Sequence, residues 1–157
     1  MNSNLAFVFP GQGSQKIGML AELAAANPLV EETFKEASEV LGYDAWKLIQ
    51  EGEQEDINLT ERTQPLLLTS SVAIWRLWQQ QGGPQPAAMA GHSLGEWSAL
   101  VCAGVVKFAD AVEIVRARGA FMQQAVPVGV GAMAAIMGIE DQIVIDACAE
   151  AAEDQIA

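Results

Sequence analysis

The sequence is poor in the residues that build metal centres and disulfide frameworks. Its 157 residues include two cysteines, Cys102 and Cys148, and a single histidine, His92. Two isolated cysteines provide neither the spacing of a zinc site nor the pairs of a small disulfide-rich fold. We therefore expect no metal and no other cofactor. We also expect both cysteines to be reduced residues of the core, as is usual in a cytoplasmic protein.

Basic residues are also scarce. Eight Lys and Arg stand against twenty Asp and Glu, which gives a net charge of −12. A nucleic-acid-binding protein needs a basic surface, so this balance argues against that class of partner. The same negative charge cannot attract an acidic protein over a long range, and docking of such a partner would need a local basic patch.

Long hydrophobic runs and a targeting segment are missing as well. The apolar stretch that ends at Phe9 is short and follows no basic region, unlike a signal peptide. Residues 119–139 carry no charge, but Pro127 and several glycines interrupt them, which favours a loop and a buried strand over a membrane span. With 51% hydrophobic and 18% charged residues, the composition is typical of a soluble globular protein.

The most informative motif is the pentapeptide GHSLG at positions 91–95. A G-x-S-x-G sequence between a strand and a helix places a serine nucleophile on a strained turn, because larger residues would not fit beside it. Apolar residues 87–90 precede the motif, and a helix-like stretch from Leu94 to Ala103 follows it. This context favours a nucleophile at Ser93 over a glycine-rich turn without chemistry.

A serine nucleophile needs a base, and the only histidine of the chain immediately precedes Ser93. Adjacent side chains in an extended backbone point away from each other, so His92 is badly placed to take the Ser93 proton. We expect His92 to pack and hydrogen-bond beneath the turn. Either the mechanism needs no histidine, or the base lies outside these 157 residues.

Alternating helix and strand patterns predict an α/β fold with a parallel sheet. We expect strands over 5–9, 87–90 and 132–137, and a polar connector over 51–56. We expect helices over 15–26, 30–41, 44–50, 109–124 and from 141 onward. A longer helix should hold Pro65 in its first turn, with Thr63 or Gln64 as its cap, and end at 82–84.

Five segments form a joint pattern along the chain. They are the strand and loop at 5–15 with PGQGSQ, TQP at 63–65, GHSLGE at 91–96, RGAFM at 118–122 and GAMAAI at 131–136. In this order they resemble the malonyl-CoA:acyl carrier protein transacylases of fatty-acid synthesis. The resemblance covers the whole visible chain.

The resemblance implies an α/β-hydrolase-like subdomain interrupted by a small ferredoxin-like one. It also implies a protein roughly twice this long, with a catalytic histidine beyond position 157. We therefore expect a fragment, or the ordered part of a longer chain. Residues 1–128 would belong to the first subdomain. Residues 129–157 would form the first strand and helix of the second, with Gly129 and Gly131 at the hinge.

The resemblance also implies roles for four residues. Ser93 would be acylated by malonyl-CoA, and the phosphopantetheine thiol of acyl carrier protein would then remove the malonyl group. Backbone N–H groups of Gln12 and Leu94 would form the oxyanion hole. Arg118 would bind the free malonyl carboxylate through two parallel hydrogen bonds. Without the resemblance, the favoured interpretation of Gln12 is a polar loop residue in a glycine turn, and that of Arg118 is a solvated helix charge.

Other interpretations remain open. A related acyltransferase, such as a polyketide-type enzyme, would use another acyl-CoA, and a serine hydrolase would share the turn without needing Arg118. The chain alone is also compatible with an inactive fragment that lacks its histidine. We expect Glu96 to be structural, Gln64 is not among the predicted site residues, and the full-length protein should be a monomer.

Overall fold

The computed structural model describes residues 2–126, 129–130 and 136–152. The chain divides into two compact units, Met1–Val126 and Pro127–Ala157, and each is described by itself. In the second unit, helix α8 spans Asp141–Ala152, as the sequence predicts for a helix from position 141 onward. The assignment of the two units to hydrolase-like and ferredoxin-like subdomains stays a prediction.

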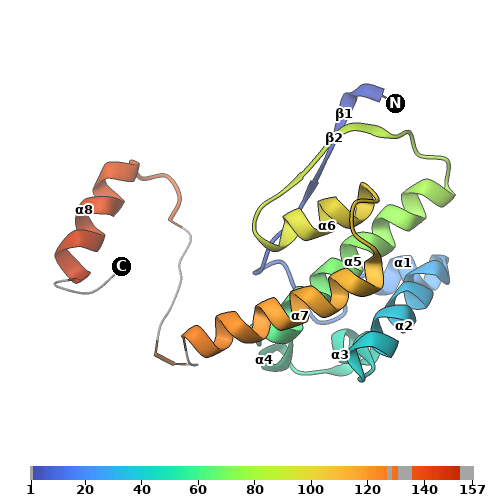
Figure 1. Ribbon diagram of the computed structural model, residues 1–157, viewed down its shortest axis with the longest axis horizontal. Helices are drawn as coiled ribbons and strands as arrows, with labels where there is room; N and C mark the ends of the chain where they lie inside the picture. The colour runs from blue at the N-terminus through green and yellow to red at the C-terminus, as the bar shows by residue number, and fades with distance from the viewer. Residues whose placement is uncertain (1, 127–128, 131–135, 153–157) are drawn as a thin grey trace. The chain divides into compact units, whose positions relative to one another are not determined.

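The first unit contains a small parallel sheet. Strand β1 spans Asn2–Phe9 and strand β2 spans Pro86–Gly91, with Phe7 opposite Met89 and Phe9 opposite Gly91 (Figure 1). Because the strands are parallel and in this register, both leave the sheet at the same edge. The two loops that follow them are therefore neighbours, at the place where open α/β sheets carry their sites. The predicted α/β class with parallel strands is confirmed.

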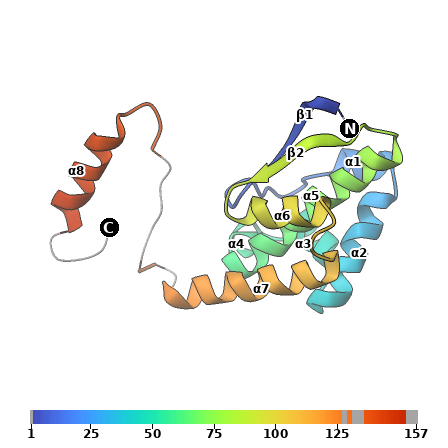
Figure 2. The same ribbon diagram turned by 45° about the horizontal axis from the view of Figure 1, so that its top comes forward.

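The first unit also contains helices, which pack against the sheet and against one another. They are α1 (Ala21–Ala26), α2 (Leu29–Leu41), α3 (Ala45–Glu51), α4 (Gln54–Ile57), α5 (Thr60–Gln80), α6 (Leu94–Cys102) and α7 (Phe108–Ala125). Helix α6 packs against both strands, and the long helix α5 packs against α2, α4, α6 and α7 (Figures 1 and 2). Thirteen residues of α5 are buried, so this helix forms the centre of the core.

Helix α2 forms as its apolar spacing predicts. Val30, Phe34 and Ala37 are fully buried, and the ring of Phe34 meets Trp46 edge-on at 5.1 Å. Gly42 ends the helix in the left-handed conformation, with φ of 77°. The next helix, α3, begins after Asp44, whose carboxylate accepts a hydrogen bond from the Lys47 N–H.

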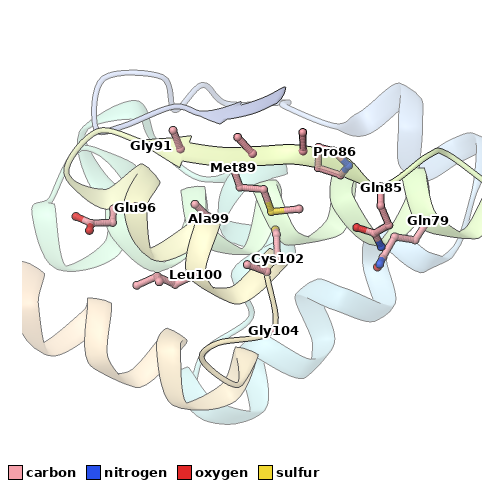
Figure 3. A pocket seen from close by; sticks show the side chains of 14 residues that line it. Gln79, Gln85, Pro86, Met89, Gly91, Glu96, Ala99, Leu100, Cys102 and Gly104 are labelled. Carbon is pink, nitrogen blue, oxygen red and sulfur yellow. The ribbon is translucent and has the colours of Figure 1, made fainter. Parts of the chain in front are cut away.

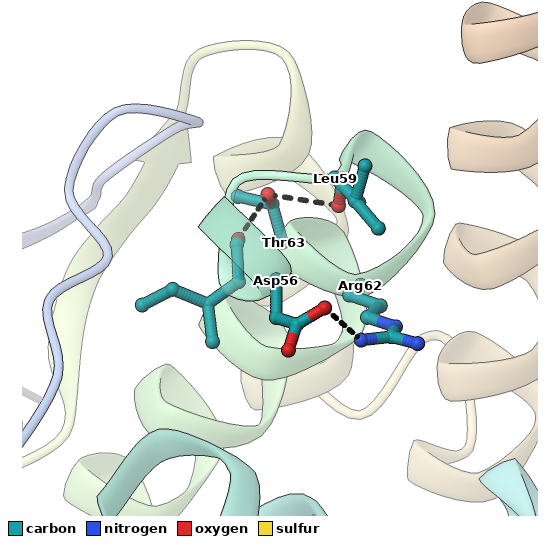
Figure 4. A network of polar contacts seen from close by, with 5 residues as sticks. Asp56, Leu59, Arg62 and Thr63 are labelled. Atoms are coloured by element: carbon teal, nitrogen blue, oxygen red, sulfur yellow. Dashed lines mark hydrogen bonds and ion pairs between the residues drawn. The ribbon is translucent and has the colours of Figure 1, made fainter. Parts of the chain in front are cut away.

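Helix α5 begins earlier than predicted. Thr63 and Gln64 are not its caps, because the helix starts at Thr60 and holds Pro65 in its interior. Figure 4 shows the reason: the Thr63 hydroxyl lies 2.6 Å from the carbonyl oxygen of Ile57 and 3.1 Å from that of Leu59. These contacts tie the first turn to the end of α4. The missing N–H of Pro65 then removes only one hydrogen bond.

Two other predicted elements differ from the structure. The helix expected over 15–26 is present only as α1, because Leu20 adopts a left-handed conformation with φ of 65° just before it. The polar connector over 51–56 contains the start of α4, which the buried Ile57 anchors to the core. Of the strand expected over 132–137, residues 132–135 lie outside the described residues, and 136–137 have no strand structure.

The two cysteines differ from each other. Cys102 is buried in the core, as expected, and burial raises the pKa of its thiol to about 12. Cys148 is exposed on α8, so the prediction that it is a core residue is wrong. Both are free thiols. In the described part of the chain, no helix is both long enough and apolar enough to cross a membrane.

Candidate active site

Ser93 lies on a sharp turn between β2 and α6. Its backbone is strained, with φ of 54° and ψ of −110°, which L-residues rarely adopt. A Cβ atom on Gly91 would lie 2.0 Å from the backbone of Gly95, and one on Gly95 would lie 2.3 Å from the carbonyl oxygen of Phe9. Side chains at these two positions would clash with backbone. The predicted reason for small residues on either side of the serine is therefore correct.

The turn leads directly into the first turn of α6. The N–H of Gly95 donates to the carbonyl oxygen of His92 at 2.9 Å, and the N–H of Glu96 to that of Ser93 at 3.3 Å. Leu94 is the first residue of the helix, so its N–H has no acceptor within the helix and lies at the positive end of the helix dipole. The Leu94 side chain is buried, which holds that peptide in place.

The loop after β1 runs against this turn. A Cβ atom on Gly11 would lie 3.2 Å from the carbonyl oxygen of His92, so the two loops are in close contact. The next residue, Gln12, donates from its side chain to the Thr60 hydroxyl at the start of α5, over 3.2 Å. The structure therefore places the Gln12 backbone beside the serine turn and tethers its side chain to α5.

Arg118 reaches the serine from α7. Its Nη2 donates to the Ser93 Oγ at 3.0 Å, and its Nη1 donates to the Gln64 Oε1 at 2.8 Å. The guanidinium is thus held by a residue of α5 and directed at the serine. The sequence predicted both Ser93 and Arg118 as site residues, and the structure brings them into contact.

Gln64 was missed by the sequence analysis. Its side chain is fully buried, its Oε1 accepts from Arg118, and its Nε2 donates to the Met122 Sδ at 3.2 Å. Both ends of this buried amide are hydrogen-bonded, and through Arg118 it forms one cluster with Ser93. The available signal was its position: Gln64 precedes an apolar run in α5, where a polar side chain needs a specific partner.

Helices α5 and α7 approach closely beside this cluster. A Cβ atom on Gly119 would lie 2.5 Å from the carbonyl oxygen of Thr60. Only glycine permits the two helices to approach this closely, and Gly119 directly follows Arg118 in the sequence. The same region of α5 thus holds Thr60, which contacts Gln12, and Gln64, which contacts Arg118.

His92 does not behave as predicted. We expected it to pack and hydrogen-bond beneath the turn, but its side chain is exposed and has no hydrogen bond within the described residues. A Cβ atom on Gly11 would lie 3.9 Å from the His92 Nδ1, so the ring lies beside the loop after β1. The described residues also contain no cluster of three or more His, Cys, Asp or Glu that could hold a metal.

A cavity of about 860 Å³ lies on the outer side of β2 and does not contain the serine (Figure 3). Gly91 and Glu96 line it at one end, and Gln79 and Gln85 at the other. None of Ser93, Arg118, Gln64 and Gln12 lines this cavity. The candidate chemistry therefore lies at the carboxyl edge of the sheet and not in this hollow.

Comparison with known proteins decides the family. Residues 6–156 match the family model described as acyl transferase domain. This chain belongs to the acyl transferase domain family. The acyltransferase chain is 65% identical over 154 residues to the malonyl CoA-acyl carrier protein transacylase of Escherichia coli K12, which covers 98% of this chain and 50% of the relative. The resemblance noted in the sequence is confirmed.

Solved structures agree with this assignment. The malonyl CoA-acyl carrier protein transacylase of Coxiella burnetii is 56% identical, with a TM-score of 0.93 over 99% of this chain and 49% of that one. A type II polyketide malonyl-transacylase in complex with its acyl-carrier protein is 60% identical, with a TM-score of 0.92 over 96% of this chain and 49% of that one. The acyltransferase chain spans about half the length of the relatives it matches.

Proposed function

We propose that the protein transfers a malonyl group from malonyl-CoA to the phosphopantetheine thiol of acyl carrier protein, in fatty-acid synthesis. The reaction passes through a malonyl ester on Ser93. One observation carries the proposal: the Arg118 guanidinium lies 3.0 Å from the Ser93 Oγ. A serine hydrolase has no need of a cation at this point, whereas a malonyl ester carries a carboxylate that needs one.

Two displacements make up the reaction. The Ser93 oxygen attacks the thioester carbonyl, a C–O bond forms, the C–S bond breaks and coenzyme A leaves as the thiol. The carrier thiol then attacks the new ester, a C–S bond forms, the C–O bond to Ser93 breaks, and the proton lost by the thiol returns to Ser93. We assign the base to a histidine outside these 157 residues, because His92 is exposed and adjacent to the serine.

Both displacements pass through a tetrahedral oxyanion. We assign its two donors to the backbone N–H groups of Leu94 and Gln12. Two observations support this: Leu94 is the first residue of α6, and the loop that carries Gln12 contacts the serine turn through Gly11. Each such donor contributes about 10²–10³ in rate.

We assign the malonyl carboxylate to Arg118. Gln64 already holds its Nη1, so the Nη2 is the group that can move from the serine oxygen to the substrate. A planar guanidinium on the carboxylate stabilises a dicarboxylic acyl group and leaves a neutral acyl group without its partner. Arg118 is thus the specificity residue of the proposal.

The finer organisation belongs to the same proposal. Residues 1–128 form the N-terminal part of an α/β-hydrolase-like subdomain, and 129–157 begin a ferredoxin-like one. The full-length protein is a cytoplasmic monomer with no cofactor, and neither nucleic acid nor membrane is its partner. This chain spans 50% of the Escherichia coli relative. That coverage supports a site to which residues outside these 157 contribute.

A second candidate is a polyketide-type acyltransferase. The similarity to a transacylase solved with a type II polyketide carrier protein favours it. Both candidate functions use Ser93 and Arg118. They differ in the carrier protein and in the acyl group that is transferred. Rates with malonyl-CoA and methylmalonyl-CoA, each measured with both kinds of carrier, decide between the two.

The proposal is tested by Arg118→Ala in the full-length protein. The ratio of malonyl to acetyl transfer should fall at least tenfold, because the lost charge-assisted hydrogen bonds serve only the carboxylate. Arg116→Ala is the matched control: this exposed arginine lies two residues away on α7, and its loss should leave the ratio unchanged. An unchanged ratio in Arg118→Ala would refute the assignment.

A further inference from the structure

We infer that Met122 is a positioning residue for Arg118 and acts through the buried amide of Gln64. This inference rests on the proposed function of Arg118. The structure shows a continuous series of contacts from Ser93 Oγ through Arg118 and Gln64 to the Met122 Sδ. The hydrogen bond of the Met122 Sδ is with Gln64, and we assign the effect of Met122 on the reaction to this contact.

The orientation of the Gln64 amide depends on both of its partners. A guanidinium only donates hydrogen bonds, so it must face the Oε1 and not the Nε2 of Gln64. A thioether sulfur only accepts, so it must face the Nε2. A flipped amide would place donor against donor at Arg118 and acceptor against acceptor at Met122. Both neighbours therefore select the same orientation.

Burial makes this selection effective. Gln64 is 0% exposed, so water cannot replace a partner that is lost. An amide with one unsatisfied end in the core costs free energy and is free to rotate. Met122 is 40% exposed and lies four residues after Arg118 on α7, so both side chains project from the same helix face towards Gln64.

The geometry fixes Arg118 as a result. While Gln64 Oε1 holds the Nη1 at 2.8 Å, the Nη2 is directed at Ser93. The close approach of α5 and α7 at Gly119 holds the two helices at the separation that this series of contacts needs. Loss of the Met122 sulfur would remove one partner of the Gln64 amide. The Arg118 guanidinium, which that amide holds, would then be less firmly oriented.

The test is Met122→Leu in the full-length protein, which keeps an apolar side chain of similar volume but removes the acceptor. We expect the ratio of malonyl to acetyl transfer to fall roughly 2- to 10-fold, the effect of one lost hydrogen bond. Acetyl transfer itself should be unchanged, because it does not use the guanidinium. Met137→Leu, at a residue that is 87% exposed, is the control and should change neither rate.

A double-mutant cycle separates positioning from packing. In a Gln64→Leu background, Met122→Leu should cause no further fall in the ratio, because the amide it orients is gone. Equal loss of both activities, an unchanged ratio, or additive effects in the cycle would overturn the inference. If Arg118→Ala alone leaves the ratio unchanged, the proposed function itself fails. If Arg118→Ala lowers the ratio and Met122→Leu does not, only the role of Met122 fails.

Discussion

The guanidinium of Arg118 donates a hydrogen bond to the Ser93 Oγ over 3.0 Å, although 25 residues separate them in the sequence. This contact joins the two features of the chain that carry chemistry. In the proposed function, the serine turn is the general part of the site, and the arginine is the part that distinguishes one acyl group from another.

The tether between Gln12 and Thr60 should affect all acyl groups equally. Thr60→Val removes the hydroxyl that accepts from the Gln12 side chain, so the loop after β1, which carries the proposed oxyanion donor, loses this attachment to α5. We expect malonyl and acetyl transfer to slow by the same factor, roughly 2- to 10-fold, with their ratio unchanged. Thr60→Ser keeps the hydroxyl and should restore both rates. A change in the ratio would contradict this role.

The turn at Ser93 should not tolerate a methyl group at Gly95. A Cβ there would lie 2.3 Å from the carbonyl oxygen of Phe9, and backbone cannot move aside as a flexible side chain can. Gly95→Ala should lower the free energy of unfolding by about 1–3 kcal/mol, despite the better helix propensity of alanine. Urea unfolding of the full-length protein measures this. A variant as stable as the parent would show that the turn is looser than described.

Ser98 offers a stabilising substitution. Its side chain is fully buried in α6, and its hydroxyl has no hydrogen-bond partner among the described residues. Ser98→Ala removes an unsatisfied polar group and should raise the free energy of unfolding by about 1 kcal/mol or more. Ser70→Ala is the matched control, because that hydroxyl donates to the carbonyl oxygen of Leu66 at 2.8 Å. Equal effects of the two substitutions would refute this explanation.

Cys102 should make stability fall at alkaline pH. Burial raises the pKa of its thiol from about 9 to about 12 in the folded protein. The unfolded chain therefore loses this proton first, and stability that is complete below pH 9 declines as the pH rises towards 12. Burial likewise raises the pKa of Tyr43 from about 10 to about 12, so its contribution begins one pH unit later.

The pH dependence of unfolding checks this directly. Between pH 9 and 10 the free energy of unfolding should decline less steeply in Cys102→Ala than in the parent. The comparison uses slopes, so the cavity left by the thiol does not interfere. Identical slopes would mean that Cys102 titrates normally in the folded protein.

The local parts of the site could be predicted from the sequence. A turn at Ser93 with small flanking residues follows from the G-x-S-x-G pattern, and in the structure a side chain at Gly91 or Gly95 would clash with backbone. The parallel pairing of β1 and β2 follows from the alternation of helices and strands. Gly42 ends α2 for a reason that is equally local, its positive φ.

Long-range contacts could not be predicted in the same way. The start of α5 depends on Thr63 bonding to Ile57 outside the helix, which the capping pattern does not contain. Gln64 becomes a site residue only because α7 lies against α5, at a separation that Gly119 permits. His92 lies beside Gly11, in the loop after β1 and far away in the sequence. In each case the partner lies on another element.

The central claim is that Ser93 carries the malonyl group, and intact mass measures it most directly. The full-length protein is mixed with malonyl-CoA, without carrier protein, and weighed before and after. The account predicts one added malonyl group, located on the peptide containing Ser93, absent from Ser93→Ala and released by acyl carrier protein. A malonyl group on another residue, or transfer to the carrier by the Ser93→Ala variant, would contradict it.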